Sequence, residues 1–343
     1  MKKRYIIPVF IPHYGCNFQC IFCNQQHITG KMTLVNEDEV QLIIEEHLKR
    51  ITEPRFIEVA FYGGSFTALP LDVQNSLLSP AKNALQKGRI QSIRISTRPD
   101  AISANIAEFL IKNHVSTVEL GIQSLDDKVL EAANRGHSVE DAQNAAGILR
   151  TYNFSWGIQL MPGLPQEDWN SLLLSGNRAV QLRPHFARIY PAIVIKHTVL
   201  EDQFRAKQYI PLSTEEAVRK SAFLKVLFSR KNISVIRMGL QATEELDRRD
   251  VVVAGPYHPA FGEMVDGFIF SQIILQALEQ IPYYPHLNII CHFRDESKIR
   301  GRGNSNLRYI ANRTGRQIKL IPQGVCQGQI SIVQKGYTYT VNC

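Results

Sequence analysis

The stretch Cys16-Asn17-Phe18-Gln19-Cys20-Ile21-Phe22-Cys23 follows an apolar run near the N-terminus and places three thiols within eight residues. Iron-sulfur clusters are held by cysteine thiolates, usually four, so a loop that supplies three leaves one iron of a 4Fe-4S cube open to a small molecule. Zinc sites favour paired C-x2-C units or Cys with His, which this C-x3-C-x2-C spacing fits poorly. An odd number of crowded thiols cannot all pair as disulfides. The stretch therefore predicts an iron-sulfur site with one vacant iron.

Length and composition are those of a globular protein. The 343 residues suffice for one large α/β barrel and a smaller appended domain. The chain has no run of eighteen apolar residues, and its start, Met1-Lys2-Lys3-Arg4-Tyr5, does not suit a signal peptide. Six cysteines suit a reducing compartment, in which thiolates persist as metal ligands and oxygen damages them. We expect an oxygen-sensitive cytoplasmic protein with no membrane partner.

The charge balance is basic. A formal net charge of +8 attracts polyanions such as RNA. The basic residues are scattered along the chain, apart from one group near the C-terminus that a solvated surface explains equally well. That group consists of Lys298, Arg300, Arg302, Arg308, Arg313 and Arg316.

From residue 4 to about 240, strand-like runs alternate with amphipathic segments, which is the pattern of parallel β/α units. The predicted strands are Tyr5–Ile11, Phe56–Tyr62, Ser92–Ser96, Thr117–Ile122, Phe154–Leu160 and Ala187–Tyr190. The predicted helices are Glu37–Arg50, Leu71–Gln86, Ala104–Lys112, Leu125–Ala133, Val139–Arg150, Glu167–Gln181 and Thr214–Ser229. Six strands with crossovers predict a partial (β/α)6 TIM-like barrel over residues 1–240, open on one side to a large substrate.

The pattern changes after about residue 240. A helix from about 261 to 280 is followed by short strand-like segments between Gly-rich turns. These segments are Leu287–Phe293, Gln317–Ile321, Gln329–Val333 and Tyr337–Val341. Residues 241–343 are therefore predicted to form a small appended α+β region.

In parallel barrels the active site lies at the carboxyl ends of the strands, in the loops that follow them. The unusual sequences of this chain all fall there, so one mouth of the barrel is predicted to collect the chemistry. They are the cysteine loop, Gly63-Gly64-Ser65, Thr97-Arg98, Gln123-Ser124 and Met161-Pro162-Gly163.

Each of these candidates has a structural alternative. Gly63 and Gly64 let backbone groups come close to a ligand, but a tight turn would also use them. Arg98 could bind a carboxylate in a fork, or pair with Asp100 as a loop brace. Gln123 ends a buried strand, where either a ligand or neighbouring loop backbone would satisfy its polar groups.

Asn134-Arg135-Gly136-His137 interrupts a helical stretch. Arg135 is a candidate for binding a carboxylate, and His137 could transfer a proton. Gly136 also suits a helix C-cap, in which glycine supplies a left-handed residue. The two interpretations can hold together.

With these motifs the chain resembles the radical S-adenosylmethionine (radical SAM) superfamily, whose signature is C-x3-C-x-aromatic-C. In that superfamily the free iron chelates SAM, and an electron from the cluster splits SAM into methionine and a 5′-deoxyadenosyl radical. The resemblance implies Cys16, Cys20 and Cys23 as ligands of a 4Fe-4S cluster, and a reductant such as flavodoxin or ferredoxin as partner. Ser65 stands where the superfamily often has an acidic residue. The SAM pocket implied by the resemblance comprises Phe22, Gly63, Gly64, Ser65, Thr97, Gln123 and Arg135.

Several blocks over residues 5 to about 240 narrow the resemblance to the radical SAM half of the catalytic Elongator subunit, an enzyme of tRNA wobble-uridine modification. That enzyme has a longer cysteine spacing and an acetyltransferase domain, whose acetyl-CoA loop we do not find in this sequence. The resemblance therefore implies tRNA or other RNA as substrate, but not acetyl transfer. The blocks are Ile95-Ser96-Thr97-Arg98-Pro99-Asp100, Glu119-Leu120-Gly121-Ile122-Gln123-Ser124, Asn134-Arg135-Gly136-His137, Met161-Pro162-Gly163-Leu164-Pro165 and Tyr190-Pro191-Ala192.

Two alternatives stay open. The short cysteine loop with Cys23-Asn24 resembles oxygen-independent coproporphyrinogen oxidase, which implies a small anionic metabolite or tetrapyrrole as substrate. A non-catalytic module that uses a zinc or iron-sulfur site only to fold is the other alternative.

Five further residues in the C-terminal region carry two interpretations each. Cys291, Cys326 and Cys343 could hold a second cluster or a metal, or be ordinary thiols, since no two share a chelating spacing. His258 and Glu263 could act as an acid/base pair, or belong to a structural turn set by the neighbouring prolines.

Overall fold

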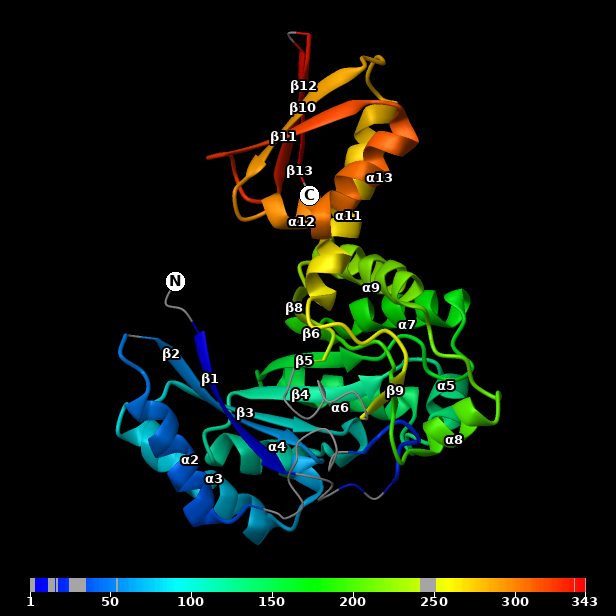
Figure 1. Cartoon of the computed structure of the whole chain (residues 1–343). Coiled ribbons are helices and arrows are strands. Elements are labelled where there is room, and N and C mark those ends of the chain that lie inside the picture. The colour runs from blue at the N-terminus through cyan, green and yellow to red at the C-terminus, as the bar shows by residue number, and fades with distance from the viewer. Residues whose placement is uncertain are drawn as a thin grey trace. The chain divides into compact units, whose positions relative to one another are not determined.

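The computed structural model describes residues 4–11, 16, 18–24, 35–53, 55–240, 251–335 and 337–342. The chain divides into two compact units, one of Met1–Ala217 with Leu224–Tyr257 and one of Val218–Phe223 with His258–Cys343. Figure 1 shows both, coloured along the chain. The domain boundary predicted between residues 240 and 241 stays a prediction.

Within the described residues, the first unit contains a sheet of seven parallel strands whose spatial order follows the sequence (Figure 1). Because each crossover returns to the next position in the sheet, the sheet curls into a partial barrel. The predicted partial TIM-like barrel is confirmed. The strands are β1 (Arg4–Ile11), β2 (Phe56–Gly63), β3 (Ser92–Thr97), β4 (Thr117–Gln123), β5 (Ser155–Leu160), β6 (Phe186–Ile189) and β8 (Ser234–Met238).

The strand count differs from the six predicted. The described sheet has a seventh strand, β8, which pairs only with β6 at the sheet edge. Its residues are exposed or half-buried, although Val235, Ile236 and Met238 are apolar. An edge strand needs less apolar surface, because it has one neighbour instead of two.

Helices follow the strands, and most of them begin at residues whose side chains cap them. Asn36, Ser138, Asp168 and Ser213 each form a capping box at the start of a helix. A short antiparallel pair, β7 (Val194–Ile195) and β9 (Val252–Ala254), also belongs to this unit. The helices are α2 (Glu37–Lys49), α3 (Leu71–Gln86), α4 (Ala104–Lys112), α5 (Asp127–Ala132), α6 (Val139–Thr151), α7 (Trp169–Leu182), α8 (Val199–Arg205) and α9 (Thr214–Ser229).

In the described part of the second unit, four strands form a sheet in the order β11-β10-β12-β13. β10 and β11 are parallel, whereas β12 and β13 are antiparallel to their neighbours. The helices α12 and α13 were not predicted. The elements are α11 (Phe261–Glu279), β10 (His286–His292), α12 (Glu296–Arg300), α13 (Ser305–Thr314), β11 (Gln317–Gln323), β12 (Gln329–Gln334) and β13 (Tyr337–Asn342).

The core of the second unit lies between one face of this sheet and the helices. Ile274 of α11, Ile310 of α13, and Ile289 and Ile332 of the sheet are among its fully or almost fully buried members. By length and composition alone α11 could cross a bilayer, but half of its apolar window is buried inside the protein. It therefore acts as a core helix of this unit.

Candidate active site

The three predicted cluster ligands lie directly after β1, at the carboxyl end of the barrel. Cys16, Cys20 and Cys23 are half-buried, and none of the described cysteines forms a disulfide. The backbone N–H of Ile21 donates to the Ala133 carbonyl (3.2 Å), and the N–H of Leu200 donates to the Ile21 carbonyl (2.8 Å). The cysteine loop is thus attached to the segments at α5 and α8.

Phe22, the aromatic residue of the cysteine motif, packs against two apolar clusters of the first unit. One contains Val129, Ala133 and Leu164, and the other contains Val194 of β7. These contacts identify the aromatic side chain as an anchor for the cysteine loop. Its predicted part in the SAM pocket stays a prediction.

Arg135 connects the cysteine loop to the sheet. Its Nη1 donates to the Sγ of Cys20 at 3.0 Å, and its Nη2 donates to the carbonyl of Gly121 on β4 at 2.5 Å. The preceding residue, Asn134, donates from its side-chain amide to the Gln19 carbonyl at 2.8 Å. The structure therefore places Arg135 at a predicted ligand.

Position 136 requires glycine because another side chain packs closely against its backbone, and not because a helix ends there. Its φ is +66°, and an added Cβ would lie 2.3 Å from the ring of Phe18 in the cysteine loop. The helix cap predicted for this glycine is wrong, because α5 ends at Ala132 and the left-handed residue after it is Asn134, with φ of 50°. Asparagine tolerates that conformation, so the glycine is free for the contact with Phe18.

Arg98 forms the loop brace that the sequence offered as one alternative. Its guanidinium pairs with Asp100 at 2.9 Å and lies 5.1 Å above the Phe18 ring. The side chain is almost fully buried, and its Nη1 has no hydrogen-bond partner among the described residues. One guanidinium N–H group at the mouth therefore remains available to a ligand.

Gly63 and Gly64 bring the carboxyl ends of β1 and β2 together. The N–H of Gly64 donates to the carbonyl of Ile11 at 2.5 Å. A Cβ on Gly63 would lie 2.8 Å from the same oxygen, and its φ of +108° disfavours other residues. A side chain at Gly63 would separate the two strand ends that position the cysteine loop.

Ser65 and Thr97, both predicted to contact SAM, bond to each other. Their hydroxyl oxygens lie 2.9 Å apart, and the hydroxyl of Thr67 lies 2.6 Å from that of Thr97. Ser65 also accepts a hydrogen bond from the Arg98 N–H at 3.2 Å. All three hydroxyl-bearing residues are buried, so their hydroxyls hold the loop after β2 against that after β3.

Gln123 ends β4 in a left-handed conformation, with φ of 74°, at an irregularity in the pairing of β4 with β5. Its side-chain oxygen accepts a hydrogen bond from Gln159 at 3.1 Å, and its carbonyl accepts one from the Met161 N–H at 2.8 Å. Non-glycine residues with positive φ are concentrated at functional sites, where the surroundings hold them in place. A Cβ built on Gly121 would lie 3.1 Å from the Gln123 amide and 3.6 Å from the Arg135 guanidinium, which places these two side chains beside each other.

Burial dominates the electrostatics of the mouth, although two arginines lie there. Burial and the neighbouring Cys20 raise the pKa of Cys16, while Arg98 and Arg135 act in the opposite direction. Burial, together with the same two arginines, lowers the pKa of His137 to about 3. His137 is therefore neutral at physiological pH, and neither ring nitrogen makes a well-formed hydrogen bond within the described chain.

A second polar cluster fills the interior of the barrel. Arg94 of β3 bonds to Glu58 of β2 at 2.8 Å and also pairs with Glu119 of β4. Arg188 of β6 bonds to Glu119 at 2.8 Å and to the hydroxyl of Tyr62 on β2 at 2.9 Å. Because β2 and β6 are not neighbours in the sheet, side chains that join them must lie on its concave face. We call these five residues the lumen network.

Comparison with known sequences decides the family. Residues 10–174 match the Radical SAM superfamily, and residues 184–269 match the Radical_SAM C-terminal domain. The chain belongs to the radical SAM superfamily. The predicted family resemblance is confirmed.

Relatives of this radical SAM chain include tRNA-acting enzymes. The chain is 26% identical over 242 residues to tRNA uridine(34) acetyltransferase of Methanocaldococcus jannaschii, covering 64% of this chain and 43% of that protein. It is 24% identical over 228 residues to the heme chaperone HemW of Bacillus subtilis, covering 63% and 57% of the two chains. This chain thus spans less than half of the acetyltransferase.

Among solved structures, Methanocaldococcus infernus Elp3 with an N-terminal deletion aligns with a TM-score of 0.65 at 22% identity, covering 79% of this chain and 64% of that one. At this identity the match establishes the fold alone.

Enzymes of this superfamily use a 4Fe-4S cluster and SAM. The residues of this radical SAM chain fit that cluster, because the described thiols are unbridged and half-buried, and two arginines lie near them. No three His, Cys, Asp or Glu side chains of the described residues are grouped to hold a single metal ion. A cube does not require such a group, since its thiolates bind different irons.

The predictions for the C-terminal residues have mixed outcomes. Cys291 is buried in the core of the second unit, which supports an ordinary thiol, and Cys326 is exposed. Cys343 lies outside the described residues. The Nδ1 of His258 accepts a hydrogen bond from the Ala260 N–H at 3.0 Å, which supports the turn interpretation.

Sequence reasoning missed the lumen network. Its signal was nevertheless present, since Glu58, Arg94 and Glu119 are charged residues inside strands that are otherwise apolar. A charged side chain in a buried strand requires a partner, which predicts a polar interior.

Proposed function

We propose that this radical SAM enzyme acts on tRNA or another RNA, with Cys16, Cys20 and Cys23 holding its 4Fe-4S cluster. The observation that carries the chemistry is the group of unbridged thiols at the barrel mouth with Arg135 against Cys20. The RNA substrate is supported by similarity across the barrel to tRNA uridine(34) acetyltransferases and by the net charge of +8. Acetyl transfer is not part of the proposal.

When bound, the cluster supplies the electron for reductive cleavage of SAM, and the protein supplies positioning and exclusion of water. Arg135 holds Cys20 in place. Phe22 fixes the loop through apolar packing, and Gly63 keeps the ends of β1 and β2 in contact. Arg135 also contributes positive charge beside the loop, whereas Phe22 and Gly63 act only on its shape.

We assign SAM binding to the backbone around Gly63 and Gly64, together with Gln123 and the free Nη1 group of Arg98. Ser65 and Thr97 contribute indirectly, because their hydroxyls are occupied by each other. Arg135 also acts indirectly, through Cys20. This division predicts that Ser65→Ala weakens SAM binding through loss of loop order rather than through loss of a direct contact.

The test is anaerobic reconstitution of the full chain, followed by assay of 5′-deoxyadenosine with and without tRNA. We expect about four irons and four sulfides per chain. Cys20→Ala should lose both the cluster and SAM cleavage, whereas Cys326→Ala, at an exposed cysteine of the second unit, should retain them. Reductant-dependent cleavage by Cys20→Ala would refute the cluster assignment.

A small anionic metabolite or tetrapyrrole is the second candidate substrate. The similarity to the heme chaperone HemW over 228 residues favours it. The two candidates are separated by adding tRNA or a porphyrin to the reconstituted protein. Stimulation of 5′-deoxyadenosine formation by the porphyrin alone would replace the RNA proposal.

Reductive cleavage requires an electron donor, for which we propose flavodoxin or ferredoxin. We also propose a cytoplasmic location, because thiolate ligands persist in a reducing compartment. The same chemistry predicts that exposure to air abolishes activity.

A further inference from the structure

The C-terminal end of this protein has few acidic residues to balance its basic ones. Residues 280–343 contain nine basic and only two acidic side chains, which is a net charge of +7 out of +8 for the whole chain. Residues 1–240 carry a net charge of +6, and residues 241–279 carry −5. The acidic residues are Asp295 and Glu296, and the basic ones are Arg294, Lys298, Arg300, Arg302, Arg308, Arg313, Arg316, Lys319 and Lys335.

The sheet of the second unit has one covered and one open face. Along β10, Leu287, Ile289 and Cys291 are buried in the core formed with the helices. The alternate residues of the same strand, beginning with His286, are exposed or half-buried. Because side chains alternate between the two faces of a strand, the second set lies on the face that the helices leave uncovered.

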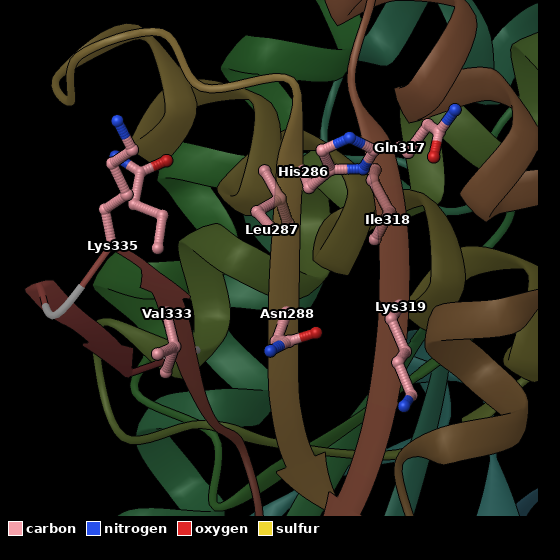
Figure 2. A pocket seen from close by; sticks show the side chains of 9 residues that line it. His286, Leu287, Asn288, Gln317, Ile318, Lys319, Val333 and Lys335 are labelled. Carbon is pink, nitrogen blue, oxygen red and sulfur yellow. The ribbon is translucent and has the colours of Figure 1, made fainter.

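The open face carries donors and no carboxylate. The register places Asn288 of β10 opposite Lys319 of β11 and Val333 of β12, and Figure 2 shows the three side chains on neighbouring strands. The open-face residues of the four described strands include no Asp or Glu. They are His286, Asn288, Ile290, His292, Gln317, Lys319, Ile321, Gln323, Gln329, Ser331, Val333, Thr338 and Thr340.

An open hollow of about 390 Å³ lies at one end of this face. Lys319 and Lys335 line it together with His286, Asn288 and Gln317, as Figure 2 shows. Lysine ammonium and amide N–H groups donate to phosphate oxygens, and no acidic side chain of the hollow competes for them. Lys335 also lies 5.2 Å from the ring of Tyr284. The hollow has the chemistry of a phosphate subsite.

An aromatic pair lies at the other end of β10. His292 and Phe293 have ring centroids 4.3 Å apart, and Phe293 is 60% exposed. The six-residue separation from His286 corresponds to roughly 20 Å along a strand. Exposed aromatic rings stack on unpaired bases, while basic side chains follow the phosphates.

We propose that the open face of the β10–β13 sheet is an RNA-binding surface, with Lys319 and Lys335 on phosphates and Phe293 on a base. The surface favours RNA over an anionic membrane, because its lysines are accompanied by amide, imidazole and hydroxyl side chains that suit phosphates and bases. The inference adds a binding site for the substrate class of the proposed function, and depends on that proposal only for the choice of RNA.

Its test is the anisotropy of fluorescein-labelled tRNA titrated with the full chain at several salt concentrations. Each phosphate contact contributes roughly 5- to 8-fold in affinity at about 0.1 M salt. The double variant Lys319→Gln/Lys335→Gln should therefore bind about 25- to 60-fold more weakly, with a shallower dependence on salt. Phe293→Ala should weaken binding at least about 5-fold with the salt dependence unchanged.

The matched control is Arg308→Gln/Arg313→Gln, which removes the same charge from exposed residues of α13. Its affinity for tRNA should lie within about 3-fold of that of the unsubstituted chain, because these two arginines are not part of the proposed surface. An equal loss in both double variants would overturn the proposal, since only the total charge would then matter. Equal or tighter binding to phosphatidylserine vesicles, lost in the same sheet variant, would replace RNA with a membrane.

This test is distinguishable from that of the proposed function. Specific loss in the sheet variant together with RNA-independent, porphyrin-stimulated cleavage would refute the proposed substrate and leave the binding surface intact. RNA-stimulated cleavage together with unchanged tRNA binding in the sheet variant would refute the binding surface and leave the proposed substrate intact.

Discussion

At the residue scale, the structure of the barrel mouth depends on a few close contacts between specific residues. Gly136 accepts the ring of Phe18, and that ring lies beneath the guanidinium of Arg98. Arg135, one residue before the glycine, reaches Cys20. A single small residue thus supports both the packing and the charge of the cysteine loop.

Gly136→Ala should destabilise the fold by about 1–3 kcal/mol, because a Cβ would displace Phe18 and strain a left-handed backbone. The measurement is urea unfolding of the apoprotein, followed by the fluorescence of the buried Trp156. Gly147→Ala in α6 is the matched control, since its Cβ would meet nothing within 4 Å. Helix propensity should make that variant about 0.5–1 kcal/mol more stable. Equal effects of the two substitutions would contradict the proposed close approach.

His137 should make stability depend on pH. Its pKa is about 3 in the folded protein, because of burial and of Arg135 and Arg98, with Asp141 acting weakly in the opposite direction. The unfolded chain binds the proton below about pH 6.5, so the free energy of unfolding falls as the pH is lowered through that value. Between about pH 6.5 and 4 this group should remove up to about 3 kcal/mol.

The check on His137 is urea unfolding of the apoprotein and of His137→Gln across this pH range. The variant should lose less stability on acidification. His114→Asn, at an exposed histidine, should behave like the unsubstituted chain. Parallel pH profiles for all three proteins would show that His137 is not buried and neutral.

At the element scale, the strands of the barrel are joined by charge as well as by backbone hydrogen bonds. Glu58, Arg94, Glu119 and Arg188 bring β2, β3, β4 and β6 together on the concave face. Buried pairs contribute little net stability, but removing one partner leaves a buried charge without compensation. The lumen network should therefore respond strongly to single substitutions.

Arg94→Met should lower the free energy of unfolding by about 3–5 kcal/mol, because Glu58 and Glu119 lose their shared cation. Arg89→Met, which breaks the exposed pair with Glu45, should cost less than about 1 kcal/mol. Chemical unfolding at pH 7 compares the two variants. Similar losses in both would mean that the lumen is solvated.

At the scale of the whole molecule, the chemistry and the least balanced positive charge reside in different units. The cysteine loop and its arginines belong to the first unit, whereas a net charge of +7 lies in residues 280–343 of the second. Such a distribution suits an enzyme that reads a polyanion with one part and reacts with the other. Binding of RNA should consequently be governed by salt.

Raising the salt concentration from about 50 to 200 mM should weaken tRNA binding on the order of 100-fold if about four phosphates are contacted. Filter binding at fixed pH measures this change. SAM binding, followed by equilibrium dialysis in parallel, should change far less, because SAM is a small molecule that releases few counterions. Salt-insensitive tRNA binding would count against an RNA substrate.

The order of helices and strands was largely predictable. α3, α4 and α9 have the predicted ends, because apolar periodicity acts over a few residues. α4 and α9 also begin at serines whose side chains cap them. β8 was missed although three of its five residues are apolar. The position of the cysteine loop followed from the same logic, because it comes directly after the first predicted strand.

What the sequence by itself determined was therefore the alternation of strands and helices, and the set of residues at the carboxyl ends of the strands. Only the tertiary structure decided their partners: Arg135 meets Cys20 across 115 residues, and Ser65 bonds to Thr97 instead of standing free. The physical reason is the separation along the chain over which each kind of interaction acts. Local periodicity specifies an element, whereas contacts between distant side chains depend on how the sheet curves and on which groups burial forces to pair.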